Sequence, residues 1–144
     1  MKKLSPQFKL WLSTKNAEGV FGDGKWRLLK AIESTGSLTA ASKMLGISYR
    51  KAWGDLKKAE KHLGISLVRK QRGGKAGGKT SLTKEGKKWI VAYGKFRNDV
   101  KKTVDKSHKK YFTPRAFSII ELMVVVSVIS LLLCLILPLS LIHI

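Results

Sequence analysis

The chain has 144 residues and carries 29 Lys and Arg against 9 Asp and Glu, a formal net charge of +20. This length suits one small domain with an appendage and leaves little room for a second globular core. So large a positive charge destabilises a compact fold by self-repulsion, which predicts a polyanionic partner, either nucleic acid or an anionic membrane surface. The lone Cys134 excludes an internal disulfide and fits a reducing compartment for the soluble part.

The first expected elements are a short strand and a helix. Apolar and other residues alternate over residues 8–12 as in a strand, and residues 21–24 form a glycine-rich turn. Asp23 is then expected to cap a helix that ends at Gly36. The buried face of this helix is expected to consist of Leu28, Leu29 and Ile32.

Residues 35–64 predict two helices joined by a tight turn. Ser37 caps a short first helix, Gly46 ends it in a left-handed conformation, and Ser48 caps a longer second helix. The apolar positions of the first helix are Leu38, Ala41, Met44 and Leu45. The second helix has an expected buried stripe of Ala52, Trp53, Leu56, Ala59 and Leu63, and outward cations at Arg50, Lys51, Lys57, Lys58 and Lys61.

This layout is typical of a DNA-reading helix-turn-helix, whose second helix begins with polar and cationic side chains. Arg50 and Lys51 are the best candidates for contacts with base edges or phosphates. An ordinary charged, solvated helix face is the alternative. For Trp53, packing in the core is favoured over contact with nucleic acid.

A basic hairpin is expected next. Residues 65–68 suggest a strand, 73–78 a flexible tip and 81–82 a returning strand, so that the run 69–79 forms a wing suited to a phosphate ribbon. A disordered basic loop that orders only on DNA is compatible with this interpretation. The candidate DNA-binding residues are Ser48, Tyr49, Arg50, Lys51, Lys57, Arg69, Arg72, Lys75 and Lys79.

Thr83 is expected to cap a long helix whose apolar stripe can pack against the domain or against a second copy of the chain. The stripe consists of Trp89, Ile90, Tyr93, Phe96 and Val100. A basic linker, 101–115, follows. From Ala116 to Leu137 the only charge is Glu121, and 22 residues at about 1.5 Å each span roughly 33 Å, enough to cross a bilayer core.

Catalytic and metal-binding functions find no support in the sequence. Residues 73–80 match the phosphate-loop pattern, but the preceding basic residues 69–72 do not suit a buried parallel strand, and no apolar strand ending in Asp follows. The histidines His62, His108 and His143 join no cluster of metal ligands. We therefore expect a non-enzyme with no cofactor and no metal.

The run FGDGKWRLLKAIESTGSLTAASKMLGISYRKAW, followed by LVRKQRGGKAGGKTSLTKEG, closely resembles the N-terminal winged-helix domain of the molybdate-responsive ModE family, a relative of LysR-type regulators. The resemblance covers roughly Lys9 to Lys101. It implies a homodimer that binds operator DNA, with the recognition helix at 48–63 and the glycine wing at 72–79. Because the remaining sequence holds no oxyanion-binding domains, we expect a DNA binder without molybdate sensing.

The apolar segment resembles the cleavage and methylation motif of type IV prepilins over residues 116–126. This resemblance implies cleavage between Ala116 and Phe117, and a role for Glu121 in subunit assembly. Ala116 stands where glycine is usual, and no pilin head follows. The last residues, 139–144, match one reading frame of a transposon end used in sequencing libraries, which gives the hypothesis of an adapter-derived tail.

The sequence therefore predicts a mainly α fold with a small β wing, a winged helix-turn-helix, plus one C-terminal apolar helix of transmembrane length. The expected parts are a DNA-binding domain at 1–100, a linker at 101–115, a prepilin-like helix at 116–138 and the tail. The expected function is a transcription regulator that binds double-stranded DNA from the cytoplasm, anchored in the inner membrane through 116–138. The alternatives are a prepilin-like membrane subunit and a misassembled fusion of a soluble regulator with a pilin fragment.

Overall fold

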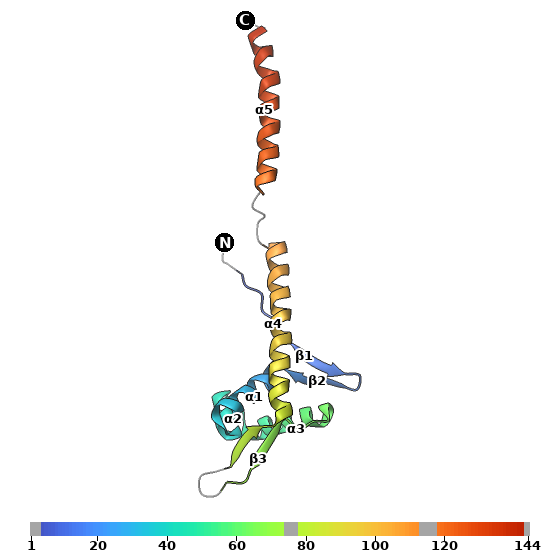
Figure 1. Ribbon diagram of the computed structural model, residues 1–144, viewed down its shortest axis with the longest axis vertical. Helices are drawn as coiled ribbons and strands as arrows, with labels where there is room; N and C mark the ends of the chain where they lie inside the picture. Colours follow the sequence, from blue (N-terminus) through green and yellow to red (C-terminus); the bar gives the residue numbers. More distant parts are fainter. Residues whose placement is uncertain (1–3, 74–77, 113–117, 143–144) are drawn as a thin grey trace. The chain divides into compact units, whose positions relative to one another are not determined.

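A computed structural model describes residues 4–73, 78–112 and 118–142 of the chain. The order of its elements is β1 (Trp11–Thr14), β2 (Ala17–Gly22), α1 (Asp23–Thr35), α2 (Leu38–Met44), α3 (Tyr49–Leu63), β3 (Val68–Gln71), β4 (Lys79–Leu82), α4 (Lys84–Phe112) and α5 (Ile119–Ile142) (Figure 1). The expected fold class is confirmed: the structure is mostly helical, with a small β wing and a long apolar C-terminal helix.

The first hairpin differs from the sequence-based expectation. β1 begins at Trp11 and pairs antiparallel with β2, so that Leu12 lies opposite Phe21. The expected turn at 21–24 is wrong, because Phe21 is fully buried at the end of β2 and Asp23 already opens α1. The chain reverses earlier, at Lys15 and Asn16, and the extended strand carries Phe21 into the core.

The start of α1 also corrects a prediction. Gly22 is the N-cap residue, with an extended backbone and no side-chain capping bond, so Asp23 does not cap the helix. The Asp23 carboxylate instead accepts hydrogen bonds from the Leu10 N–H and from side chains of α4. The C-terminal end is as expected, since Gly36 adopts a left-handed φ of 67° and its N–H bonds to the Ile32 carbonyl.

The two expected caps of the helix-turn-helix are confirmed. Ser37 accepts a hydrogen bond from the Ala40 N–H at 3.3 Å, and Ser48 accepts one from the Lys51 N–H at 3.1 Å. Gly46, between the helices, has a φ of 66°, a conformation that glycine adopts at no steric cost. Met44 is exposed, and the third buried position of α2 belongs to Ser42.

The hydrophobic core lies between α1, α2, α3 and the bases of both hairpins. The α3 stripe is confirmed in its centre, where Ala52, Leu56 and Ala59 are fully buried, while Trp53 and Leu63 pack against the core from its edge. The largest fully buried side chains are Phe21, Leu28, Leu29, Ile32, Leu38, Leu56 and Leu67.

The wing is an antiparallel hairpin in which Val68 lies opposite Leu82 and Gln71 opposite Lys79. β3 starts at Val68, later than the expected strand at residue 65, and extends into the basic run. The reason is that Leu67 turns into the core ahead of the ladder. The Thr80 N–H donates to the Gly36 carbonyl at 2.9 Å, which fixes β4 beside the end of α1.

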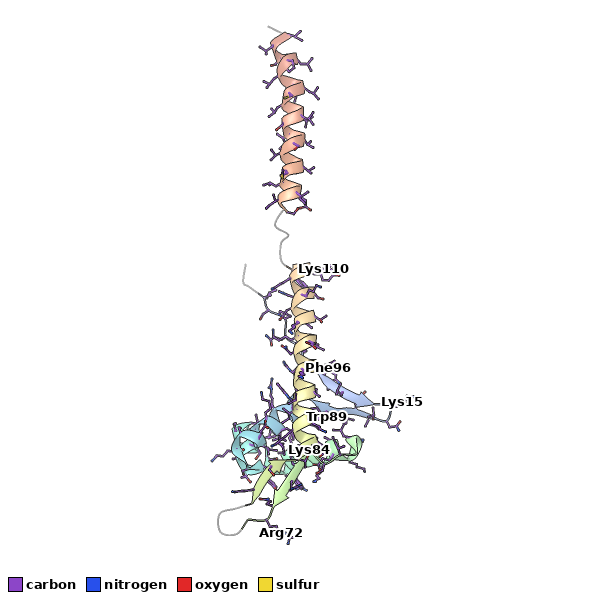
Figure 2. All side chains as sticks on the ribbon, in the orientation of Figure 1. Lys15, Arg72, Lys84, Trp89, Phe96 and Lys110 are labelled. Carbon is purple, nitrogen blue, oxygen red and sulfur yellow. The ribbon has the colours of Figure 1, made fainter. Side chains whose placement is uncertain are left out.

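Thr83 caps α4, as expected, by accepting a hydrogen bond from the Gly86 N–H at 2.9 Å. The helix is longer than its predicted apolar stripe and runs without interruption to Phe112. The part of the expected basic linker that the structure describes, residues 101–112, is thus helical. Trp89 and Phe96 follow one another along this helix (Figure 2).

The chain divides into two compact units, Met1–Ser107 and His108–Ile144. In the second unit, Ser118 and Glu121 cap α5 reciprocally: the Glu121 N–H donates to the Ser118 hydroxyl, and the Ser118 N–H donates to the Glu121 carboxylate. Pro138 lies inside α5, which continues past it to Ile142. By length and composition α5 is able to cross a membrane, with a mean hydropathy of 3.0.

Candidate nucleic-acid interface

The first turn of α3 presents polar and cationic side chains to solvent. Tyr49 is 39% exposed, and Arg50 and Lys51 are exposed beside it. Lys51 forms an ion pair with Asp55 one turn later, at 3.0 Å. Within the part of the chain that the structure describes, the Arg50 side chain makes no hydrogen bond or ion pair, so its guanidinium retains its full capacity to donate to an acceptor.

The middle of α3 holds a cation that is already engaged. The Lys57 ammonium lies 2.7 Å from a Glu60 carboxylate oxygen and 4.6 Å from the centre of the Trp53 ring. The other Glu60 oxygen accepts from the Leu67 and Val68 N–H groups at 2.8 and 3.1 Å. Lys57, a candidate for DNA contact, thus also takes part in fixing the wing to α3.

The electrostatics of Glu60 reflect this role. Burial favours the neutral acid and would raise the pKa of Glu60, but the hydrogen bonds from Lys57 and from the two backbone N–H groups outweigh burial and lower the pKa. The carboxylate is therefore ionised at neutral pH and carries the charge that these donors stabilise.

A second contact between α3 and the wing comes from Lys70 of β3. Its ammonium donates to the Tyr49 hydroxyl at 2.9 Å and lies 5.3 Å from the centre of the Trp53 ring. Trp53 is accordingly shared: one part of the ring packs on the core, as predicted, and another faces the two lysine ammonium groups. This geometry is typical of a cation–π interaction.

Three of the candidate cations of the wing, Arg69, Arg72 and Lys79, are exposed. Arg72 lies at the far end of the described wing (Figure 2). Lys75 lies outside the described residues. The structure therefore brings the α3 candidates and the three described wing candidates to neighbouring elements, joined by the contacts of Glu60 and Lys70.

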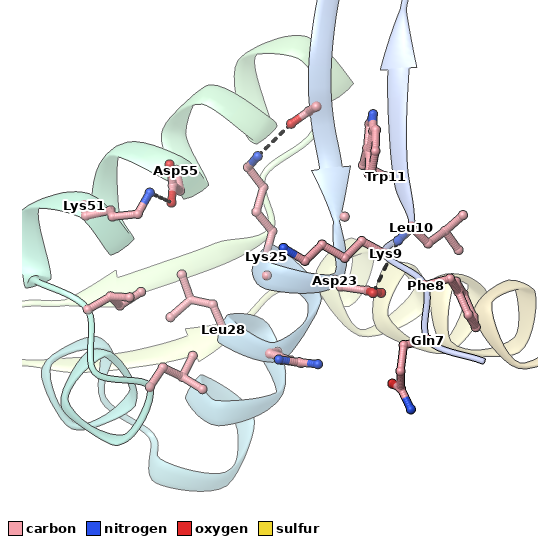
Figure 3. Close-up of a pocket in the computed structure, with 16 residues that line it drawn as sticks. Gln7, Phe8, Lys9, Leu10, Trp11, Asp23, Lys25, Leu28, Lys51 and Asp55 are labelled. Atoms are coloured by element: carbon pink, nitrogen blue, oxygen red, sulfur yellow. Dashed lines mark hydrogen bonds and ion pairs between the residues drawn. The ribbon is translucent and has the colours of Figure 1, made fainter. Parts of the chain in front are cut away.

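On its other flank, α3 borders a groove that is lined by the start of α1, by residues 7–11 and by the turn before α3 (Figure 3). Lys25 reaches across this groove and donates to the Gly19 carbonyl at 2.8 Å. Burial lowers the pKa of Lys25. The nearby charge of Asp55 would raise this pKa, and those of Lys51 and Lys58 lower it further. Lys9 and Arg27 add further positive charge to the lining.

A polar cluster fixes α4 to the start of α1. The Tyr93 hydroxyl bonds to the Leu10 carbonyl at 2.8 Å and to Asp23 at 3.0 Å, and the Arg97 guanidinium donates to Asp23 at 2.7 Å. Burial would raise the pKa of Asp23, but these hydrogen bonds reverse the shift and lower it. Burial also raises the pKa of Tyr93, with the neighbouring carboxylate acting in the same direction.

The geometry agrees with the rejection of a phosphate loop. Lys79 and Thr80 lie in β4, and the Thr80 side chain is buried. A phosphate loop instead needs its final Lys-Thr pair at the start of a helix that follows a strand. The described residues contain no group of three or more His, Cys, Asp or Glu side chains placed to hold a metal ion.

Of the three residues named for the prepilin resemblance, the structure describes one, Glu121. Ala116 and Phe117 lie outside the described residues. Glu121 is exposed in the first turn of α5, where its carboxylate and backbone bond to Ser118. The prepilin resemblance and the adapter hypothesis for 139–144 stay predictions.

Sequence reasoning missed the residues that orient the site. Glu60, Lys70 and Arg97 were not singled out, and Asp23 and Tyr93 were assigned other roles, a helix cap and an apolar stripe, since a polar residue on a helix or in a basic strand gives no sign of its distant partner. One signal was present for Lys70: strand alternation places it on the same face as the buried Val68.

Comparisons with known proteins agree with this geometry. Residues 24–87 match the family described as bacterial regulatory helix-turn-helix protein, lysR family. The chain is 40% identical over 82 residues to the molybdenum-pterin-binding protein MopB of Rhodobacter capsulatus, covering 57% of this chain and 30% of MopB. It is 35% identical over 88 residues to the transcriptional regulator ModE of Yersinia pestis, covering 60% of this chain and 34% of that protein.

A solved structure shares the fold. The crystal structure of the CbnR_DBD–DNA complex superposes with a TM-score of 0.50 at 20% identity, over 60% of this chain and 94% of that chain. Residues 24–87 are thus similar to the helix-turn-helix of the lysR family, and the N-terminal part of the chain is similar to ModE and MopB. The chain spans about a third of the length of these two homologues.

Proposed function

We propose that this chain is a DNA-binding transcription regulator of the LysR and ModE type and not an enzyme. The observation that carries the proposal is the exposed cationic start of α3 beside a cationic wing, on a chain with a net charge of +20. Further support comes from the relatives, one of which is named a transcriptional regulator, and from the structural neighbour, which is a complex with DNA.

In the proposed complex, α3 enters the major groove with its N-terminal turn first. Arg50 donates to base edges, for which guanine O6 and N7 are the commonest acceptors, while Tyr49 and Lys51 contact bases or phosphates. Ser48 keeps its cap on the helix. Arg69, Arg72, Lys75 and Lys79 of the wing neutralise phosphates and set the register without reading sequence.

The first test measures the affinity of the full chain, purified in a mild detergent, for a labelled duplex over a range of salt concentrations. We expect the logarithm of the binding constant to fall linearly with the logarithm of salt concentration, with the steepness of about six or more neutralised phosphates. Absence of binding to any duplex at low ionic strength would overturn the proposal.

A second test concerns Arg50. The Arg50→Ala variant should reduce discrimination between a duplex selected from a random pool and a duplex of unrelated sequence by about 1 to 3 kcal/mol. Lys106→Ala removes the same charge from the exposed face of α4 and serves as the control, with unchanged discrimination. An unchanged ratio in Arg50→Ala would show that Arg50 does not read bases.

We also propose that the chain acts as a homodimer through α4. Six uncharged residues recur on one stripe of this helix at alternating spacings of four and three, as in a coiled-coil seam. They are Trp89, Tyr93, Phe96, Val100, Thr103 and Ser107. Tyr93 packs in the domain core, with Trp89 packed against it, but Phe96 is 45% exposed, so the seam is open from Phe96 onward.

Light scattering of the purified chain tests the dimer. Phe96→Glu should give a monomer, because it places a charge in the seam. Val91→Glu is the matched control: Val91 is also an exposed apolar residue of α4, at 55%, and lies about 140° around the helix from Phe96. A dimer that survives Phe96→Glu would contradict the seam.

For α5 we propose membrane insertion, which would hold the DNA-binding domain in the cytoplasm at the inner membrane. The helix has 24 residues, and none of them is buried in the structure. Extraction of membranes at high pH should leave the chain in the pellet, whereas a Leu132→Lys, Leu133→Lys variant should appear in the supernatant. Release of the unmodified chain would contradict insertion.

A further inference from the structure

Among the wing cations that the structure describes, Lys70 differs from the others in what its ammonium group contacts. It donates to the Tyr49 hydroxyl at 2.9 Å and lies 5.6 Å from the centre of the Tyr49 ring and 5.3 Å from that of Trp53. Its neighbour Arg69 lies on the opposite face of the strand, because successive side chains alternate. The ammonium of Lys70 thus faces α3 and is engaged before any DNA arrives.

The contact closes one end of the junction between α3 and the wing. At the other end, Glu60 of α3 accepts from the Leu67 and Val68 N–H groups. A wing that is attached to α3 at two points has a fixed orientation, whereas a wing attached at one point could rotate about it. With Lys70 in place the wing is fixed at Val68 and again two residues further along β3.

The hydrogen bond also determines what Tyr49 can offer to a ligand. A phenol has one O–H to donate and an oxygen that accepts. Because Lys70 has only donors, the Tyr49 oxygen accepts from it and the O–H remains for an external acceptor. Donation from an ammonium polarises the phenol, so that its own outgoing hydrogen bond is strengthened.

We propose that Lys70 is a positioning residue that holds the wing against α3 and makes Tyr49 an obligatory hydrogen-bond donor toward DNA. The acceptors that fit are phosphate oxygens and, in the major groove, the N7 atoms of purines, guanine O6 and thymine O4. Lys70 itself neutralises no phosphate. This inference rests on the proposed function, because it assigns roles within the same DNA interface.

The test compares Lys70→Met, Tyr49→Phe and the double variant, each as the full chain in detergent, on a duplex selected from a random pool by the unmodified chain. Each single variant should bind roughly five- to tenfold more weakly, the loss of about one hydrogen bond. In the Lys70→Met background, Tyr49→Phe should cost less than about twofold, since the two residues act as a unit.

Salt dependence separates positioning from phosphate binding. Lys79→Met, on the paired strand, should lower the slope of affinity against salt by about 1, as expected when one phosphate is no longer neutralised. Lys70→Met should leave the slope unchanged, and Lys70→Arg, which retains a cationic donor, should restore affinity to within about twofold.

The inference is overturned if the losses of Lys70→Met and Tyr49→Phe simply multiply, or if Lys70→Met lowers the salt slope as Lys79→Met does. In both cases the unmodified chain still binds DNA and the proposed function stands. If the unmodified chain binds no duplex, the proposed function and this inference fail together. Equal melting temperatures of the single variants and the unmodified chain show that the differences do not arise from unfolding.

Discussion

The two hairpins of this chain are anchored in the same way but to different helices. The wing, β3–β4, is held by Glu60 of α3, which accepts from the Leu67 and Val68 N–H groups. The segment that leads into β1 is held by Asp23 of α1, which accepts from the Leu10 N–H at 3.4 Å. In each case one carboxylate accepts hydrogen bonds from the backbone at the start of a strand.

The difference lies in the second set of partners. Glu60 pairs with Lys57 of its own helix, so the wing follows α3. Asp23 pairs with Arg97 and Tyr93 of α4, so the first hairpin is fixed to the long helix. The chain has 9 acidic residues against 29 basic ones. Two of the acidic residues anchor the hairpins, and the surplus basic residues remain available to a polyanion.

The largest expected effect comes from the base of the wing. A Cβ at Gly86 would overlap the Leu67 carbonyl oxygen, a backbone atom that cannot rotate away. We expect Gly86→Ala to lower the free energy of unfolding, measured with urea, by about 3 kcal/mol. Gly24→Ala is the control, because that Cβ meets open space and alanine favours the helix. Equal stabilities of the two variants would contradict this packing.

Asp23→Asn tests the anchor of the first hairpin. The Asp23 side chain is only 14% exposed, and the substitution leaves Arg97 without its charged partner, so we expect a loss of about 2 to 3 kcal/mol in unfolding free energy. Amide exchange should accelerate at Leu10 and remain slow at Val68. Asp105→Asn, which breaks an exposed pair with Lys101, should cost less than about 0.5 kcal/mol. Faster exchange at Val68 would show that the hairpins are not anchored separately.

Glu60→Gln tests the anchor of the wing and should cost about 1 to 2 kcal/mol. The cost is smaller than at Asp23, because the glutamine carbonyl oxygen can still accept from the two backbone N–H groups, and the cation that loses its partner, Lys57, is more exposed to solvent than Arg97. The side chain is 10% exposed, so its hydrogen bonds are little weakened by solvent. Amide exchange should now accelerate at Leu67 and Val68 and not at Leu10. The reverse pattern would contradict the assignment of Glu60 to the wing.

Local signals in the sequence were enough for the parts of the fold that depend on neighbours along the chain. The serine caps of α2 and α3 and the left-handed glycines are set by residues a few positions apart, and the strands of the antiparallel wing are separated only by a short glycine-rich run. The first hairpin was missed, because its key pair, Leu12 opposite Phe21, depends on burial of Phe21 beneath Trp89 and Tyr93 of α4.

The same distinction applies to the candidate site. The outward cations of α3 could be predicted from helical spacing alone. Which of them are engaged depends on contacts across the fold, such as that of Lys70 with Tyr49, 21 residues apart. Asp23 was assigned to a cap for the same reason: a local rule favours Asp at a helix start, but Arg97, 74 residues away, determines its place.

The smallest expected effect is the pH dependence that the two anchors add. The pKa values of Asp23 and Glu60 are lowered in the folded chain, so each carboxylate contributes stability that is present above its unfolded pKa of about 4 and is lost as the pH falls through its folded pKa. Unfolding free energy, measured at constant ionic strength, should therefore fall below about pH 4 in the unmodified chain. The Asp23→Asn, Glu60→Gln double variant should show a shallower fall, because neither group can take up a proton. Parallel curves for the unmodified chain and the double variant would show that these carboxylates are no better stabilised folded than unfolded.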